Sequence, residues 1–385
     1  MNSNWTYKKI GDVCTVERGG SPRPIDKYIT EDDNGINWIK IGDTSDSMYI
    51  TSTAQKIIPE GMKKSRYVEP GDFLLSNSMS FGRPYILKID GCIHDGWLVL
   101  RDINNLFDKR FLYYYLSSPT TYQKFKMLAV GGVVNNLNSN MVRGVEIPIP
   151  TKEEQKNIAN ILDKVNELIH NRKQQLQQLD ELVKARFVEL FGDPETNTKN
   201  YKTVMLSEIA EYYNGLTYSP DNIAEDGTIV LRSSNIQNSQ LDFADMVRVD
   251  CTIKEKLYVR DNDILMCSRN GSARLVGKVA LIKNISEPMS FGAFMMIIRS
   301  KYYPYLMTYF QMKAFRRQIK TGATTTINQI TGNMLNKISL PLPEMSEINE
   351  FTTFIEQVDK SKFVVQKALD EAQTLFDSLM QEYFG

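Results

Sequence analysis

The sequence predicts a duplicated α+β protein in which two mixed domains alternate with two long helices. Two observations support this prediction. A repeat has a period of about half of the 385 residues, and a heptad pattern follows each of two Pro-x-Pro segments, the first pattern being interrupted at Arg172. The composition is that of a globular chain, since 42% of the residues are hydrophobic and 24% are charged. No apolar run approaches the roughly 18 residues that a membrane-spanning helix needs.

The repeat is clearest around the two Pro-x-Pro segments. NSNMVRGVEIPIP aligns with TGNMLNKISLPLP at a shift of 193 residues, and the same shift places Phe191-Gly192 on Phe384-Gly385. Earlier in each half, PGDFLLS resembles DNDILMCS and WIKIGD resembles VLRSSN. We therefore expect domains over 1–150 and 193–343, with helices over 151–192 and 344–385.

Both predicted helices carry a heptad seam. Apolar residues recur at spacings near four and three from Ile158 to Leu190, and again from Phe351 to Leu379. Thr151 and Glu154 have the spacing of a capping box. Because the first helix enters the second domain and the second helix leaves it, the seams can pack only in an antiparallel coiled coil. Such a tandem repeat has pseudo-two-fold symmetry. The alternative is an ordinary surface helix on each domain.

Short runs bounded by Gly, Asn and Asp predict the strands of the two domains. We expect strands at Gly35–Ile41, Asp72–Ser76, Trp97–Arg101, Ile229–Arg232, Asp263–Cys267, Lys278–Lys283 and Phe294–Arg299. Two aromatic-rich helices are expected at Arg110–Met127 and Tyr303–Lys320, with their tyrosines and phenylalanines in the core. Asp72 and Asp263 stand in turn-like tripeptides, so we expect turn roles for them rather than metal binding.

The net charge is zero, from 46 basic and 46 acidic residues, whereas nucleic-acid-binding proteins are usually basic. Residues 1–150 nevertheless carry +2 and residues 201–343 carry +5, whereas residues 344–385 carry −6. The four cysteines are scattered and there are only two histidines, which argues against a zinc site. Without an apolar signal segment, a reduced cytoplasmic protein is the simplest expectation.

Several of these segments resemble the specificity (S) subunit of type I restriction-modification systems. The resemblance is carried by IPIPTKEEQKNIANIL and its echo LPLPEMSEINEFTTFI, by KKIGDVCTVERGGSPRP, WIKIGD and PGDFLLS, and by SRNGSARLVGKVALI. It covers nearly the whole chain and includes the repeat layout. The second copy departs from it at Glu347-Ile348, where the first copy has Glu154-Gln155, which puts in doubt only the local helix cap.

The resemblance implies two target-recognition domains that each read one half of a bipartite DNA sequence, with the helices as a spacer. It also implies that the chain holds two methyltransferase subunits and, through them, two restriction subunits. S-adenosylmethionine, ATP and Mg would be bound by those partners, so no cofactor or catalytic site is expected in this chain. In agreement, the sequence has no phosphate-binding loop and no G-x-G-x-x-G motif.

Loops rich in Gly, Ser, Asn and Arg are the candidate DNA contacts, because these side chains match base edges and phosphates. The first domain offers Ser21, Arg23, Asn77, Ser78, Arg83, Asn135, Asn136 and Asn138. The second offers Tyr218, Ser233, Ser234, Asn235, Ser268, Arg269, Asn270, Ser272, Arg274, Thr324, Thr325, Asn328 and Gln329. Arg269 is the strongest single candidate. The alternative is that these are solvated loops that only connect strands.

Three other functions stay open at this point. A divergent methyltransferase or nuclease would need motifs that are missing from the sequence. A scaffold that joins proteins through a coiled coil would fit the acidic second helix. A specificity subunit that works with a methyltransferase alone cannot be distinguished by sequence from one with a restriction partner.

Overall fold

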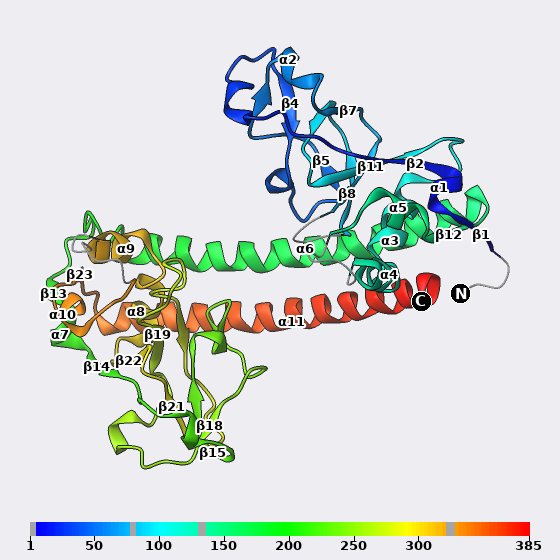
Figure 1. Ribbon diagram of the computed structural model, residues 1–385. Coiled ribbons are helices and arrows are strands. Elements are labelled where there is room, and N and C mark those ends of the chain that lie inside the picture. The colour runs from blue at the N-terminus through cyan, green and yellow to red at the C-terminus, as the bar shows by residue number, and fades with distance from the viewer. Residues whose placement is uncertain (1–4, 78–81, 130–135, 321–327) are drawn as a thin grey trace. The chain divides into compact units, whose positions relative to one another are not determined.

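The computed structural model describes residues 5–77, 82–129, 136–320 and 328–385 (Figure 1). Contacts group the chain into two units. Unit 1 comprises Met1–Lys173 with Lys367–Gly385, and unit 2 comprises Gln174–Gln366. Each long helix thus contributes one half to each unit. Within the described residues, no helix is both long and apolar enough to span a membrane.

Unit 1 contains two five-stranded sheets. The first has the order β2-β11-β8-β9-β5, with bounds Cys14–Arg18, Trp97–Asp102, Phe73–Ser76, Pro84–Leu87 and Tyr49–Ile50. The second has the order β3-β6-β4-β10-β7, with bounds Ile29–Thr30, Lys56–Ile57, Ile36–Ile39, Gly91–Ile93 and Arg66–Val68. A separate pair joins β1 (Thr6–Lys9) to β12 (Glu146–Ile149). The helices are α1 (Ile10–Val13), α2 (Pro59–Met62), α3 (Lys109–Ser117), α4 (Pro119–Ala129) and α5 (Ser139–Arg143).

Unit 2 repeats this plan with fewer strands. Its main sheet has the order β14-β22-β19-β20, with bounds Glu211–Asn214, Met295–Arg299, Ile264–Cys267 and Val279–Leu281. Two smaller groups are β18-β15-β21 (Arg248–Val249, Ile223–Leu231, Met289–Phe291) and β16-β17 (Ile236–Gln237, Gln240–Leu241). β13 (Thr203–Met205) pairs with β23 (Ser339–Pro341). The helices are α7 (Leu206–Ile209), α8 (Tyr303–Tyr309), α9 (Lys313–Lys320) and α10 (Gly332–Leu335).

The pairing pattern confirms the tandem repeat. The antiparallel succession β2-β11-β8-β9 of unit 1 recurs as β14-β22-β19-β20 in unit 2, and the parallel pair β4 with β10 has a counterpart in β15 with β21. A close backbone approach also recurs. A Cβ atom built on Gly19 would lie 2.2 Å from the His94 carbonyl oxygen, and one on Gly215 would lie 2.1 Å from the Gly292 carbonyl oxygen. Neither position can hold a side chain without moving backbone.

Asp72 and Asp263 also correspond in the two units, and both do more than the predicted turn role. Each carboxylate accepts the backbone N–H three residues earlier, as a turn residue does. Each is also ion-paired with an arginine of the central strand: Asp72 with Arg101 at 2.9 Å and Asp263 with Arg299 at 2.7 Å. The interpretation as turn residues was therefore incomplete, because the pairing partner lies about 30 residues further along the chain.

Both long helices are continuous, α6 over Lys152–Phe191 and α11 over Met345–Phe384. The predicted capping box is present at the start of α6, where Thr151 N–H donates to Glu154 at 2.9 Å. The second copy is capped as well, since Glu344 N–H donates to the carboxylate of Glu347 at 3.2 Å. The departure at Glu347-Ile348 therefore does not remove the cap.

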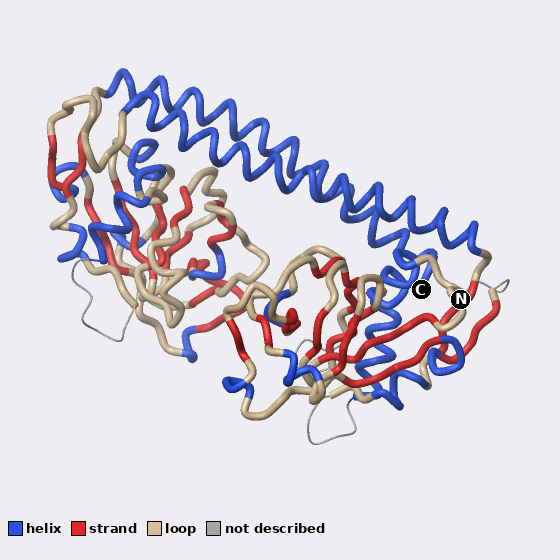
Figure 2. Tube along the Cα trace, turned by 90° about the horizontal axis from the view of Figure 1, so that it is seen from above, coloured by secondary structure: helices blue, strands red, loops and turns tan. Residues whose placement is uncertain are grey.

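The helices pack antiparallel, as predicted (Figures 1 and 2). In unit 1 the start of α6 packs against the end of α11, and Ile158 and Leu162 share a core with Met380 and Phe384. In unit 2 the end of α6 meets the start of α11, where the ring of Phe351 lies 5.7 Å from that of Phe187. In both units the helix seam is continuous with the core of the domain it contacts.

Two predicted helices are wrong in extent. The helix expected over Arg110–Met127 is divided into α3 and α4, and that expected over Tyr303–Lys320 is divided into α8 and α9. The first division falls at Ser118, whose extended backbone is the conformation that the following Pro119 favours. The second falls where Phe310 N–H and Met312 N–H bond to the last turn of α8, and α9 then starts at Lys313. The expected aromatic core is present around both breaks.

Candidate nucleic-acid interface

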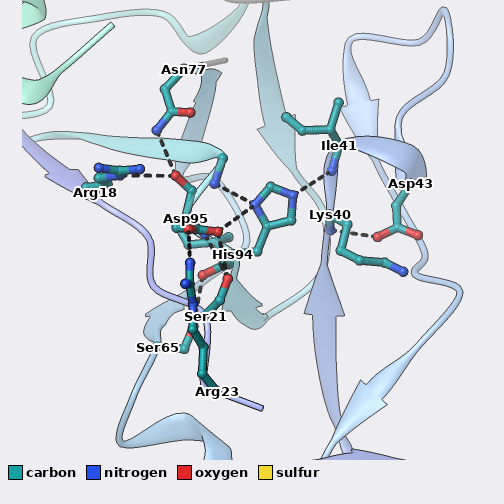
Figure 3. Close-up of polar contacts among 12 residues, drawn as sticks. Arg18, Ser21, Arg23, Lys40, Ile41, Asp43, Ser65, Asn77, His94 and Asp95 are labelled. Atoms are coloured by element: carbon teal, nitrogen blue, oxygen red, sulfur yellow. Dashed lines mark hydrogen bonds and ion pairs between the residues drawn. The ribbon is translucent and has the colours of Figure 1, made fainter. Parts of the chain in front are cut away.

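In unit 1, three predicted site residues converge on the turn between β10 and β11 (Figure 3). The carboxylate of Asp95 accepts a hydrogen bond from Ser21 Oγ at 2.7 Å and lies 3.4 Å from Arg23 Nη2. The Asp95 carbonyl oxygen accepts hydrogen bonds from Asn77 Nδ2 at 2.8 Å and from Arg18 Nε at 3.1 Å. The bond from Ser21 lowers the pKa of Asp95. Sequence reasoning missed Asp95, because its partners lie 18 to 77 residues away.

The members of this Asp95 cluster differ in accessibility. Asn77 is only 3% exposed and its side-chain amide is bonded inside the fold, whereas the side chain of Arg23 is 82% exposed. The side chain of Asn77 is therefore turned inward and braces the turn, and its contact with DNA stays a prediction. Arg23 is held over the turn and remains accessible to a ligand.

His94 is partly buried and packs beneath the same turn. Its ring lies 6.3 Å from that of Trp38 and 6.4 Å from that of Trp97, and Gly96 N–H donates to its Nδ1 at 2.6 Å. Burial lowers the pKa of His94. These contacts give His94 a structural role.

The other predicted residues of unit 1 do not join the Asp95 cluster through any described contact. Arg83 and Asn136 are exposed, and Asn138 caps α5 by accepting from Met141 N–H at 3.0 Å. Ser78 and Asn135 lie outside the described residues.

In unit 2, a larger group of predicted residues is brought together around the loop after β19. Asn270 Nδ2 lies 3.4 Å from Ser233 Oγ, and Asn328 Nδ2 donates to the Gly271 carbonyl oxygen at 3.3 Å. An isolated β-bridge joins Arg269 to Gln329. The structure thus assembles Ser233, Arg269, Asn270, Asn328 and Gln329 from three separate segments. Thr324 and Thr325 lie outside the described residues.

Two further candidates of unit 2 are interior residues. Asn235 is 1% exposed, and its amide accepts from Arg232 N–H and donates to the carbonyl oxygens of Asp242 and Asp245. Ser268 is 6% exposed, and its backbone groups bond to Phe294 and Ile330. Both side chains therefore lie beneath the surface of the domain, and their contacts with DNA stay predictions.

The remaining candidates of unit 2 lie around this group. Ser272 and Arg274 are exposed, Ser234 is half-buried, and Tyr218 packs on the small apolar cluster of Leu216 and Val230. One contact was not foreseen: the guanidinium of Arg269 lies 5.3 Å from the centre of the Phe294 ring. Nothing in the sequence distinguishes Phe294 from the nearby buried Phe291, since both stand in the same apolar stretch.

The described part of the chain offers no site for a metal ion, since no three of its His, Cys, Asp and Glu residues are grouped as ligands. The cysteines Cys14, Cys92, Cys251 and Cys267 are free thiols. Burial raises the pKa of Cys14 to about 12, so this thiol is protonated at neutral pH.

A family model for the type I restriction modification DNA specificity domain matches this chain twice, over residues 2–181 and 198–372. This chain belongs to that family. The two matches coincide with the two copies of the repeat, and they make the chain a type I specificity subunit with two DNA-recognition domains. Membership of this family also argues against the alternative of a scaffold that joins proteins through a coiled coil.

Individual relatives agree with this assignment. The specificity subunit of the type I restriction enzyme EcoKI from Escherichia coli strain K12 is 21% identical, over 99% of this chain and 88% of its own length. A chain solved in work on assembly and conformational transition of the type I R-M system has a TM-score of 0.58 at 16% identity, covering 100% of this chain and 98% of that chain. The type I restriction-modification S subunit of M. genitalium gives 0.55 at 16% identity, covering 100% and 97%. These two structures support the fold.

Proposed function

We propose that this specificity subunit reads a bipartite, asymmetric DNA target, with one half-site for each recognition domain. The proposal rests on one observation: the two copies share a framework of strands but carry different side chains at the surface turns. They share strand order, the Asp–Arg ion pair and the glycine approach, yet they present different side chains at the same turns. A common frame with different surfaces supports two different half-sites.

The antiparallel helices support a role as a spacer between the two readers. Each helix has 40 residues, which at about 1.5 Å per residue gives a length near 60 Å. Two modules that read the same face of a duplex need centres about 34 Å apart, or one helical turn. A helix pair of this length is long enough to span such a distance.

Catalysis and cofactor binding belong to other subunits in this proposal. The chain would hold two methyltransferase subunits, and two restriction subunits through them, while S-adenosylmethionine, ATP and Mg would be bound by those partners. A complex with methyltransferase subunits alone is the second candidate. It has the same DNA-reading role, and the presence of a restriction subunit in the purified complex decides between the two.

The modest charge of the recognition domains predicts weak DNA binding by the isolated chain. Phosphate contacts supply most of the non-specific affinity, and the excess positive charge is only +2 over residues 1–150 and +5 over residues 201–343. An electrophoretic titration of the isolated chain should show weak, salt-sensitive binding that tightens when the methyltransferase subunits are added. Nanomolar, salt-resistant binding by the chain alone would contradict this.

The spacer role is tested by changing the length of both helices together. An insertion of four residues in α6 and in α11 lengthens each by about 6 Å. Mapping of methylated bases across a genome should then show an altered spacer between unchanged half-sites. Altered half-sites with an unchanged spacer would refute the role of the helices.

A further inference from the structure

We propose that Arg269 and Phe294 act together to read one guanine in the half-site bound by the second recognition domain. The inference rests on the proposed function and assigns it to two side chains. Arg269 would donate two hydrogen bonds to the guanine edge, and Phe294 would hold the guanidinium in the orientation that this requires.

The pair is formed at the surface of unit 2. Phe294 is 58% exposed, although the residues that follow it in β22 are buried. The guanidinium carbon of Arg269 lies 5.3 Å from the centre of this ring, within the range of a cation–π contact. An exposed phenyl ring under an exposed cation contributes little to a core, so its position points to contact with a ligand.

The backbone under both side chains is fixed. The Phe294 carbonyl oxygen accepts from Ser268 N–H at 2.9 Å and from Arg269 N–H at 3.1 Å. The β-bridge between Arg269 and Gln329 holds the loop from its other side. The two side chains therefore project from one hydrogen-bonded frame, which keeps their relative orientation constant when DNA approaches.

Arg269 retains its donors for a ligand. Among the described residues, no hydrogen bond or ion pair to its guanidinium is found, whereas Arg232 pairs with Asp245 at 2.7 Å. The neighbouring amides of Asn270 and Asn328 already bond within the loop region. A guanidinium that is stacked through its face still presents two N–H groups at its edge, in the geometry of guanine O6 and N7.

The first domain has different chemistry at the equivalent turn. There Asn77 N–H donates to the Gly96 carbonyl oxygen at 3.0 Å, as Ser268 N–H donates to that of Phe294. Glycine thus replaces the phenyl ring, and the exposed Arg23 pairs with the carboxylate of Asp95 instead. The Arg269–Phe294 pair therefore belongs to the second reader alone, and its effect should be confined to one half-site.

The test uses the full chain assembled with its methyltransferase subunits. Methylated sites are mapped for the wild type, for Arg269→Lys and for Phe294→Ala. We expect Arg269→Lys to relax discrimination at one guanine of one half-site by roughly tenfold, because lysine cannot make the bidentate contact. Phe294→Ala should relax the same position by roughly threefold. The half-site of the first domain should not change in either variant.

Arg260→Lys is the matched control, since Arg260 is an exposed arginine of unit 2 that lies outside the candidate DNA-contact loops. It should leave the recognised sequence unchanged. If Arg269→Lys also keeps the wild-type sequence, or if Phe294→Ala relaxes another position, the inference is wrong. If the wild-type complex modifies no two-part target, the proposed function fails instead, so the two failures are distinguishable.

A second measurement uses only the wild-type complex, so it tests the inference even if the variants do not assemble with the methyltransferase subunits. Each guanine of the second half-site is replaced in turn by 7-deazaguanine, which lacks the N7 acceptor, and binding of the wild-type complex is measured. One position should weaken binding by roughly tenfold. If no position is sensitive, the inference is overturned without reference to any variant.

Discussion

The two recognition domains are most alike in the paired strands of their sheets, and they differ most at the turns that reach the surface. Both place an Asp–Arg ion pair between equivalent strands, Asp72 with Arg101 and Asp263 with Arg299. At the turn before the central strand, the first domain has a carboxylate bonded to serine and arginine, whereas the second has a phenyl ring under an arginine. Duplication has therefore preserved the groups that hold the frame and changed those that can touch a ligand.

The largest expected effect concerns the shared ion pair, whose two copies differ in burial. In both copies the arginine binds the carboxylate through two nitrogens, but the side chain of Asp263 is 1% exposed whereas that of Asp72 is 14% exposed. Removing one partner of a buried pair leaves an uncompensated charge, which costs about 3–5 kcal/mol. We expect Arg299→Met to cost about 3 kcal/mol of stability in unit 2, and Arg101→Met about half of that in unit 1.

Hydrogen exchange resolved along the chain can assign each loss to its unit. The matched control is the double change Asp263→Leu with Arg299→Met, which removes both charges and should cost less than Arg299→Met alone. Equal losses for Arg299→Met and Arg101→Met would show that the burial difference has no energetic consequence.

A second comparison concerns the first turns of α6 and α11, where one copy buries a polar side chain and the other buries an apolar one. Gln155 is fully buried and bonds to Asp108 N–H at 2.6 Å and to the carbonyl oxygens of Leu106 and Pro150. The equivalent Ile348 is 1% exposed and packs in an apolar core. Gln155→Leu should cost about 2 kcal/mol, because one buried and two part-buried backbone groups lose their partner.

The reciprocal variant Ile348→Gln should cost a similar amount, since it buries an amide in an apolar cluster. Chemical denaturation with a constant slope would measure both. If either substitution is neutral, the two junctions are interchangeable, and the chemical difference between the copies carries no structural information.

The sequence could predict the features that depend on local pattern. The repeat, the seams of both long helices and the box formed by Thr151 and Glu154 all follow from spacing along the chain, and the structure contains them. Ser118 and Pro119 could have predicted the division between α3 and α4, since the residue before a proline favours an extended backbone. Local composition also identified the loop around Arg269, which the structure joins to Ser233 and Asn328.

Contacts between distant segments could not be predicted in this way. The carboxylate of Asp95 accepts a hydrogen bond from Ser21, which lies 74 residues earlier in the chain. Phe294 contacts Arg269 only because β19 and β22 are neighbours in the sheet. The burial of Asn77 and Asn235 depends on the same tertiary arrangement. Residue type therefore indicated which loops have polar chemistry, while the sheet pairing decided which of their side chains reach the surface.

The smallest expected effect concerns the helix seam itself. Lys362 occupies the seam position that Ile169 occupies in the first copy, and its Nζ lies 2.5 Å from Asp180 of α6. Lys362 is 19% exposed but Asp180 is 55% exposed, so the pair is largely solvated and its contribution is small. Ile169 is only 5% exposed in unit 1, which shows that isoleucine packs at this seam position. Lys362→Ile should therefore raise the stability of unit 2 by up to about 1 kcal/mol.

The gain in stability should come with a loss of register control, because a charged seam residue selects one alignment of two helices at a cost in stability. The urea midpoint should rise at constant slope, while methylated sites should include spacers one base pair longer or shorter. Lys367→Gln, on an exposed face of α11, is the control and should change neither quantity. A higher midpoint with an unchanged spacer would assign register to the aromatic end of the seam, where Phe187 packs on Phe351.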